Sequence, residues 1–129
     1  MKARAPALVL LAEDFEDARD LYKDYLEFSG FAVETATNGR EAITRAIELQ
    51  PDLILMDASM PVLDGWQATR ELKANPATKH IPVLALTAHA FDDARQEARS
   101  SGCDGFVIKP CLPDDLVAKV RETLGGCGH

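Results

Sequence analysis

Leu53-Ile54-Leu55-Met56-Asp57 places four consecutive apolar residues directly before a carboxylate. An uninterrupted apolar run of this length is typical of a parallel strand that is buried on both faces of its sheet. Other short apolar runs occur before and after it, and together they indicate five strands. The five runs span residues 7–12, 31–36, 53–56, 82–87 and 105–108.

Longer segments follow these runs, and in them apolar residues recur at three- and four-residue steps, the period of an amphipathic helix. The expected helices span residues 16–29, 39–50, 64–74, 92–101 and 113–124. Gly30 and Gly102 stand where two of these helices should end, as glycine does at helix C-termini. Five strand–helix units predict an α/β fold, a doubly wound five-stranded parallel sheet with helices on both faces.

The dipeptide Asn38-Gly39 admits two interpretations, because between apolar runs it is a strong hairpin signal. The segment that follows it has helical periodicity rather than the alternation of a strand. We therefore expect a strand-to-helix turn here, and a β-hairpin is the alternative.

The length of 129 residues, 47% of them hydrophobic, suits one compact domain with a buried core. We expect a single domain over residues 1–129, with its core over about 7–124. The glycine-rich tail at 125–129 is too short to form a second domain.

The net charge of −7, from 21 acidic and 14 basic residues, disfavours direct binding to the phosphate backbone of nucleic acids. Cys103, Cys111 and Cys127 lack the C-x-x-C spacing of a zinc site or redox pair, which indicates reduced thiols. The apolar run at 7–11 is too short for a signal-peptide core or a membrane span. These features predict a cytoplasmic protein without membrane insertion.

Polar side chains stand at the ends of four of the five expected strands. They are Glu13 and Asp14 after the first strand, Asp57 at the end of the third, Thr87 at the end of the fourth and Lys109 after the fifth. The carboxyl ends of parallel strands meet at one edge of a sheet, where α/β proteins bind their ligands. We therefore expect these side chains to converge.

Three carboxylates at one edge would repel one another strongly unless a cation lay among them, and oxygen ligands suit Mg²⁺. Mg²⁺ commonly binds one or two carboxylates and keeps positions for water and phosphate oxygens. The set therefore predicts a Mg²⁺ site with room for a phosphoryl group. Each residue alone has a plainer explanation: Glu13 and Asp14 as acids at a helix N-terminus, Asp57 as a cap, Thr87 as a strand residue and Lys109 as a surface residue.

As an ordered set, these residues resemble the receiver domain of two-component response regulators, over roughly residues 7–124. The motifs that carry the resemblance are Ala12-Glu13-Asp14, Asp57-Ala58-Ser59-Met60-Pro61 followed by Asp64-Gly65, Leu86-Thr87-Ala88 and Lys109-Pro110. The resemblance implies the flavodoxin-like strand order for the (βα)₅ sheet. It also implies a phosphoacceptor switch that catalyses its own phosphorylation and dephosphorylation, rather than a turnover enzyme.

The resemblance assigns a role to each strand-end residue. Asp57 is expected to be the phosphoacceptor, and Asp14 and the Asp57 carboxylate to bind Mg²⁺. Glu13 would help through a water molecule, and the backbone carbonyl of Ser59 would supply a further ligand. Lys109 would place a positive charge near the phosphoryl oxygens, and Thr87 would donate a hydroxyl hydrogen bond to them.

The family resemblance also implies how phosphorylation changes the surface of the protein. Movement of Thr87 toward the phosphoryl group would vacate space for Phe106, and the face made by the fourth helix, fifth strand and fifth helix would change. A permanently buried core aromatic is the alternative reading of Phe106. The implied partners are a histidine kinase or histidine phosphotransfer protein and a downstream protein that binds this face.

Some positions depart from the family pattern. Glu13 stands where Asp is commoner, and its extra methylene could shift the metal. Cys111 replaces a frequent aromatic, and Ser59 and His89 are expected to tune the phosphoryl lifetime. We read His89 as a tuning or surface residue rather than a metal ligand, because His80 and His129 form no cluster with it.

Two other classes of protein share part of this pattern. A phosphatase of the haloacid-dehalogenase kind needs an Asp two residues after its nucleophile, where Ser59 stands. A flavodoxin needs small donors after the first strand, where Glu13 and Asp14 would repel the flavin phosphate. A receiver-like binding module that is not phosphorylated, and a receiver excised from a hybrid histidine kinase, stay open.

Overall fold

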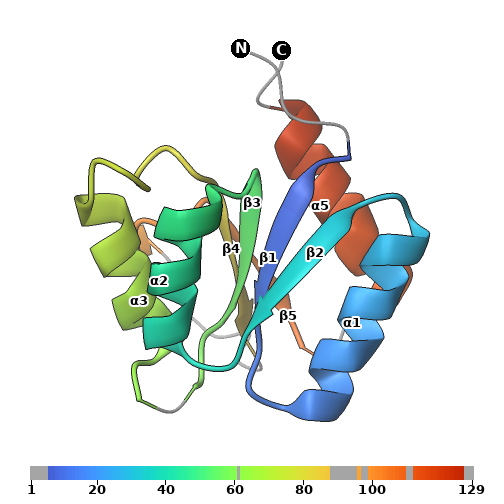
Figure 1. Cartoon of the computed structure of the whole chain (residues 1–129), viewed down its shortest axis with the longest axis horizontal. Helices are drawn as coiled ribbons and strands as arrows, with labels where there is room; N and C mark the ends of the chain where they lie inside the picture. The colour runs from blue at the N-terminus through green and yellow to red at the C-terminus, as the bar shows by residue number, and fades with distance from the viewer. Residues whose placement is uncertain (1–5, 61, 88–95, 97–98, 110–111, 127–129) are drawn as a thin grey trace.

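The computed structural model describes residues 6–60, 62–87, 96, 99–109 and 112–126. Its central layer is one parallel sheet with helices on both sides (Figure 1). The strands are β1 (Leu8–Ala12), β2 (Ala32–Ala36), β3 (Leu53–Asp57), β4 (Val83–Thr87) and β5 (Gly105–Ile108). The helices are α1 (Glu16–Phe28), α2 (Gly39–Leu49), α3 (Gly65–Ala74) and α5 (Pro113–Gly126).

The strand order is β2-β1-β3-β4-β5, and every neighbouring pair is parallel. This arrangement confirms the predicted doubly wound α/β fold. All residues of β1, β3 and β4 are buried, whereas the edge strands β2 and β5 are partly exposed. Continuous apolar runs therefore mark the three central strands, as expected for strands covered on both faces.

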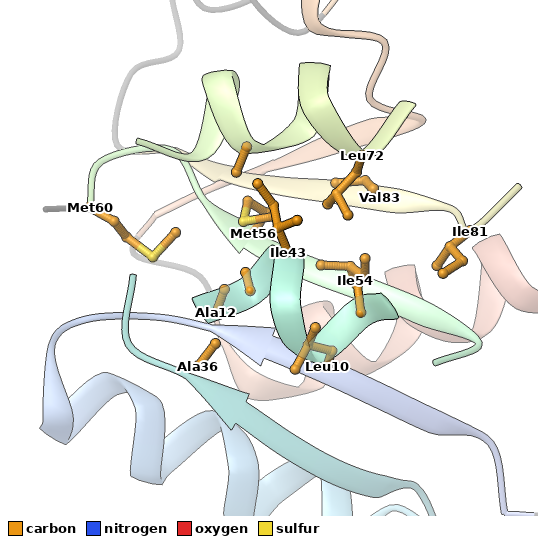
Figure 2. Close-up of a cluster of buried hydrophobic side chains, with 13 residues drawn as sticks. Leu10, Ala12, Ala36, Ile43, Ile54, Met56, Met60, Leu72, Ile81 and Val83 are labelled. Atoms are coloured by element: carbon orange, nitrogen blue, oxygen red, sulfur yellow. The ribbon is translucent and has the colours of Figure 1, made fainter. Parts of the chain in front are cut away.

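Alternate residues of the central strands face two separate cores. Leu10 and Ile54 point to the side covered by α2 and α3, where they pack with Leu72 (Figure 2). Val9 and Leu55 belong to the other core, which includes buried residues of α1 and α5. The period-two alternation of strand side chains thus gives each layer of helices its own apolar surface.

Local sequence signals mark where the helices begin and end. The Asn38 side chain accepts a hydrogen bond from the Glu41 amide at 2.8 Å, so α2 begins at Gly39 and the hairpin alternative is wrong. Gly30 has a φ of 104° directly after α1, a left-handed conformation that suits glycine. Gly102 has a φ of 87° at the end of the segment predicted as the fourth helix.

The predicted helix at 92–101 lies largely outside the described residues, although 96 and 99–101 are helical. Strand and helix limits elsewhere agree with the prediction to within two residues; β3, for example, includes Asp57, and β5 has the predicted limits. Among the residues that the structure describes, no helix combines the length and apolar character needed to cross a bilayer.

Candidate active site

A pocket of about 480 Å³ opens at the carboxyl edge of the sheet. Its lining residues come from the last residues of β3 and β4 and from the segments that follow β1, β3 and β5. They are Glu13, Asp14, Phe15, Asp57, Ala58, Ser59, Met60, Asp64, Trp66, Thr87 and Lys109. The structure therefore brings together all the predicted catalytic and metal-binding residues, while Phe106 is not among those that line the pocket.

The sheet register explains why these residues meet. Ala12 lies opposite Met56 in the β1–β3 pair, so Glu13 and Asp57 extend from neighbouring strands at the same level. Asp57 lies opposite Leu86, which places Thr87 one residue further along the edge. The Lys109 amide donates to the Thr87 carbonyl at 2.7 Å and holds the lysine beside β4.

Three carboxylates form an acidic cluster in this pocket. Ligand oxygens of Glu13, Asp14 and Asp57 all lie within 4.8 Å of one another. Glu13 is wholly buried, Asp57 is 5% exposed and Asp14 is exposed to solvent. Clustered carboxylate oxygens that are open to solvent on one side fit a hard divalent cation such as Mg²⁺, which keeps some of its water.

Lys109 is the cationic side chain of the pocket. Its Nζ lies 2.9 Å from Glu13 Oε1 and 3.5 Å from Asp57 Oδ2. Burial acts to lower the pKa of Lys109, but the hydrogen bond to Glu13 and the negative charges of Asp57 and Glu13 raise it on balance. The ammonium is therefore charged at neutral pH and available to an anionic ligand.

Asp57 is held in an environment that disfavours its negative charge. Burial, a hydrogen bond with Glu13 and the nearby Glu13 charge raise the pKa of Asp57 to about 7. The Ser59 amide donates to Asp57 Oδ1 at 3.1 Å and Lys109 is close by, and both act in the opposite direction. A cation at this site would relieve the remaining repulsion between the two carboxylates.

The loop after β3 is shaped by close backbone packing. A Cβ atom on Gly65 would overlap the backbone carbonyl of Asp57, so a larger residue cannot occupy this position without moving the loop. The Gly65 amide donates to the Ala58 carbonyl at 3.0 Å, and the Asp64 side chain caps α3 by accepting from Gln67. Val62 has a φ of 69°, a strained conformation for a β-branched residue.

The predicted switch residues lie on neighbouring strands. Thr87 is 3% exposed at the pocket wall. Phe106 is partly buried on β5 and is paired in register with Ala85, two residues before Thr87. The proposed tuning residue His89 and the loop residue Cys111 lie outside the described residues.

Sequence reasoning missed part of the pocket wall. Phe15, Met60 and Trp66 line the pocket, although each looks like an ordinary apolar residue in the sequence. Phe15 is 62% exposed, whereas Met60 is buried and also belongs to the core beneath α2 and α3 (Figure 2). The available signal was their place in the motifs: Phe15 and Trp66 directly follow Asp14 and Gly65, and Met60 lies within the segment that begins at Asp57.

The family model for the response regulator receiver domain matches residues 9–121, which is most of the chain. The chain belongs to this family. Receiver domains are signalling switches of two-component systems, and this membership favours that function over the haloacid-dehalogenase and flavodoxin alternatives. They bind Mg²⁺ at an acidic pocket and interact with histidine kinases or phosphotransfer proteins and with downstream targets.

Two relatives match this chain over nearly all of its length. The polar-differentiation response regulator DivK of Brucella anthropi is 36% identical over 120 residues, covering 93% of this chain and 98% of DivK. The chemotaxis response regulator CheY4 of Vibrio cholerae is 31% identical with a TM-score of 0.85, covering 90% of this chain and 97% of that one.

A third relative bears on the metal. The receiver domain of a sensor histidine kinase from Pseudomonas aeruginosa is 31% identical with a TM-score of 0.86, covering 92% of this receiver and 98% of that chain. That structure has a magnesium ion coordinated in its active site cleft.

Proposed function

We propose that Asp57 accepts a phosphoryl group from the phosphohistidine of a histidine kinase or histidine phosphotransfer protein, with Mg²⁺ bound beside it. The observation that carries this proposal is the pocket itself. It places a nearly buried carboxylate next to two other acidic side chains and an ammonium. These are the groups that phosphoryl transfer to a carboxylate requires.

Four residues of this chain would hold the metal ion. Asp14 and Asp57 would bind Mg²⁺ through their carboxylates, Ser59 through its backbone carbonyl and Glu13 through a water molecule. When bound, Mg²⁺ offsets negative charge on the oxygens of the transferred group. The close approach of the three carboxylates supports this assignment, because a divalent cation among their oxygens would relieve the repulsion between them.

The transfer step uses few groups because positioning does most of the catalysis. One Asp57 oxygen forms the new bond to phosphorus while the phosphorus–nitrogen bond breaks, and the leaving imidazole keeps the electron pair. Lys109 attracts the phosphoryl oxygens, and the Thr87 hydroxyl donates a hydrogen bond to them. Later attack of water on phosphorus releases phosphate and regenerates the Asp57 carboxylate, so the switch also resets itself.

The output is a change of surface rather than a chemical product. We propose that Thr87 moves toward the phosphoryl group and that Phe106 turns into the vacated space. The face formed by the fourth helix, β5 and α5 would then bind a downstream protein. The net charge of −7 supports a protein target rather than nucleic acid, and we place the protein in the cytoplasm.

The chain is proposed to act as one receiver domain over residues 1–129. Origin as a receiver within a hybrid histidine kinase would leave its chemistry unchanged. A binding module that is never phosphorylated would be a different function. Phosphorylation with acetyl phosphate distinguishes it from a phosphoacceptor.

Incubation with acetyl phosphate and Mg²⁺, followed by intact-mass measurement, tests the proposal. Wild type should gain one phosphoryl group, and EDTA should abolish the gain. Asp57→Asn should not be labelled, whereas Asp24→Asn, which removes an exposed carboxylate of α1, should label like wild type. Lys109→Met should slow labelling on the order of a hundredfold, the usual effect of losing one electrostatic contact in the transition state. Unlabelled wild type would support the binding module instead.

A further inference from the structure

The dipeptide Asn38-Gly39, which begins α2, is chemically labile. In an asparagine–glycine pair the glycine nitrogen can attack the asparagine side-chain carbonyl, because glycine has no side chain to obstruct the approach. Asn38 and Asn75 are the asparagines of the chain, and Asn75 is followed by Pro76, whose nitrogen has no proton to lose. Asn38 is therefore the asparagine of this sequence that can deamidate readily by this route.

The reaction replaces an amide by a carboxylate and needs no oxidant or reductant. The Gly39 nitrogen gives its proton to water or hydroxide and forms a bond to Asn38 Cγ, and Nδ2 takes a proton from the solvent and leaves as ammonia. Water then opens the resulting succinimide ring at either of its carbonyl carbons. The products are aspartate and isoaspartate at position 38, and in isoaspartate the backbone runs through the former side chain.

The attacking nitrogen is engaged in the folded protein. Gly39 is buried at the start of α2, and its amide donates to the Leu63 carbonyl at 3.0 Å. The same carbonyl lies so close that a Cβ atom on Gly39 would overlap it. Leu63 belongs to the loop between β3 and α3, which lies against the start of α2 (Figure 1). The hydrogen bond retains the proton that the reaction must remove.

The side chain that would be attacked is held as well. Asn38 Oδ1 accepts from the Glu41 amide at 2.8 Å, and the Asn38 backbone is extended, with a ψ of 172°. The Glu41 carboxylate accepts from the amide and the hydroxyl of Thr37 at 2.6 and 2.9 Å, and these hydrogen bonds lower the pKa of Glu41. A planar succinimide ring needs a different ψ at Asn38, so ring closure requires the contacts around Asn38 to break.

We propose that Asn38 is a latent deamidation site that the Leu63 carbonyl protects. While the loop after β3 lies against α2, the Gly39 nitrogen cannot attack; when the loop moves away, the reaction proceeds. Isoaspartate adds a methylene to the backbone before Gly39, so the contact with Leu63 cannot re-form in its original geometry. The modification is irreversible and therefore records openings of this loop. It depends neither on phosphorylation of Asp57 nor on a metal ion.

Deamidation rates of the folded and unfolded protein test the site. Wild type is incubated at mildly alkaline pH with and without denaturing guanidinium chloride; ion-exchange chromatography separates the more acidic product, and peptide mapping locates the change. The folded protein should deamidate at least about thirtyfold more slowly than the unfolded chain, the equilibrium weight of two ordinary hydrogen bonds. Asn38→Ser keeps a helix-capping side chain and should not form the acidic product in either state.

Two destabilised variants separate loop movement from global unfolding. Gly65→Ala adds the Cβ that overlaps the Asp57 carbonyl, two residues after Leu63, whereas Leu72→Ala removes buried volume within α3. A low concentration of denaturant brings both variants to the same free energy of unfolding. At equal stability Gly65→Ala should deamidate about fivefold faster than Leu72→Ala, the weight of one hydrogen bond. Its Gly39 amide should exchange with solvent correspondingly faster by NMR.

Three results would each overturn part of the proposal. If folded and unfolded wild type deamidate at the same rate, the fold gives Asn38 no protection. If Gly65→Ala and Leu72→Ala react at the same rate at equal stability, global unfolding exposes the site and the loop does not control it. If unfolded wild type forms no product at position 38, Asn38 is not a deamidation site.

Discussion

Replacing Asp57 by asparagine should stabilise the metal-free receiver at neutral and higher pH. The pKa of Asp57 is raised from 3.8 to about 7, with burial as the largest cause and Glu13 next. The folded protein therefore favours the protonated acid, whereas the unfolded chain releases this proton near pH 4. The stability that the protonated form contributes is present below about pH 4 and is lost as the pH rises to about 7.

The size of this effect follows from the same pKa. A rise from 3.8 to about 7 corresponds to about 4 kcal/mol of unfolding free energy at high pH. Asparagine keeps the side-chain volume and can still accept from the Ser59 amide, which donates at 3.1 Å in wild type. We expect Asp57→Asn to be more stable than wild type by about 2–4 kcal/mol at pH 8.

Urea unfolding in EDTA at pH 4, 5, 6, 7 and 8 measures this difference directly. The gain in stability of Asp57→Asn over wild type should be small at pH 4 and should grow up to pH 8. Taking the difference between the two proteins cancels the titration of groups that do not interact with Asp57. An Asp57→Asn protein that is less stable than wild type at pH 8, or a difference that does not vary with pH, would refute the reasoning.

Further changes test the loop and the core by urea unfolding. Val62→Gly should stabilise the protein by about 1 kcal/mol, because glycine adopts the φ of 69° without strain; a loss of stability would contradict this. Gly65→Ala should destabilise by about 1–3 kcal/mol and slow labelling of Asp57, because its Cβ overlaps the Asp57 carbonyl. Leu72→Ala should cost about 2–5 kcal/mol, since Leu72 is wholly buried; a cost below about 1 kcal/mol would show that the core can collapse around the gap.

The arrangement of strands was predictable because burial on both faces leaves a direct mark in the sequence. The apolar run at 53–56 became β3, which ends at Asp57, so the carboxylate stands at the strand end as expected. The helical period after Asn38 correctly outweighed the hairpin signal. Strand order came from the family resemblance, since apolar runs do not specify which strands are neighbours.

The sequence also predicted which residues lie together in the candidate site. The carboxyl ends of parallel strands converge at one edge of the sheet, whatever the sequence of the helices between them. Glu13 and Lys109 are 96 residues apart in the chain, yet both line one pocket. The sequence could not say which carboxylate the ammonium prefers. That preference depends on side-chain reach and burial, which only the packed structure determines.

Backbone features of the loop after β3 were the least predictable. The motif Asp64-Gly65 was recognised as part of a pattern, but the close approach of Gly65 to the Asp57 carbonyl needs two segments in three dimensions. The left-handed conformation of Val62 has no sequence signal, because valine disfavours it. Such strain persists only where surrounding contacts fix the loop.

Identification of the phosphorylated residue tests the central claim most directly. The receiver is labelled with acetyl phosphate and Mg²⁺, the acyl phosphate is reduced with borohydride, and tandem mass spectrometry locates the modified residue. The account predicts modification at Asp57, with none at Glu13 or Asp14. Modification at another carboxylate, or equal labelling of the Asp57→Asn protein, would contradict it.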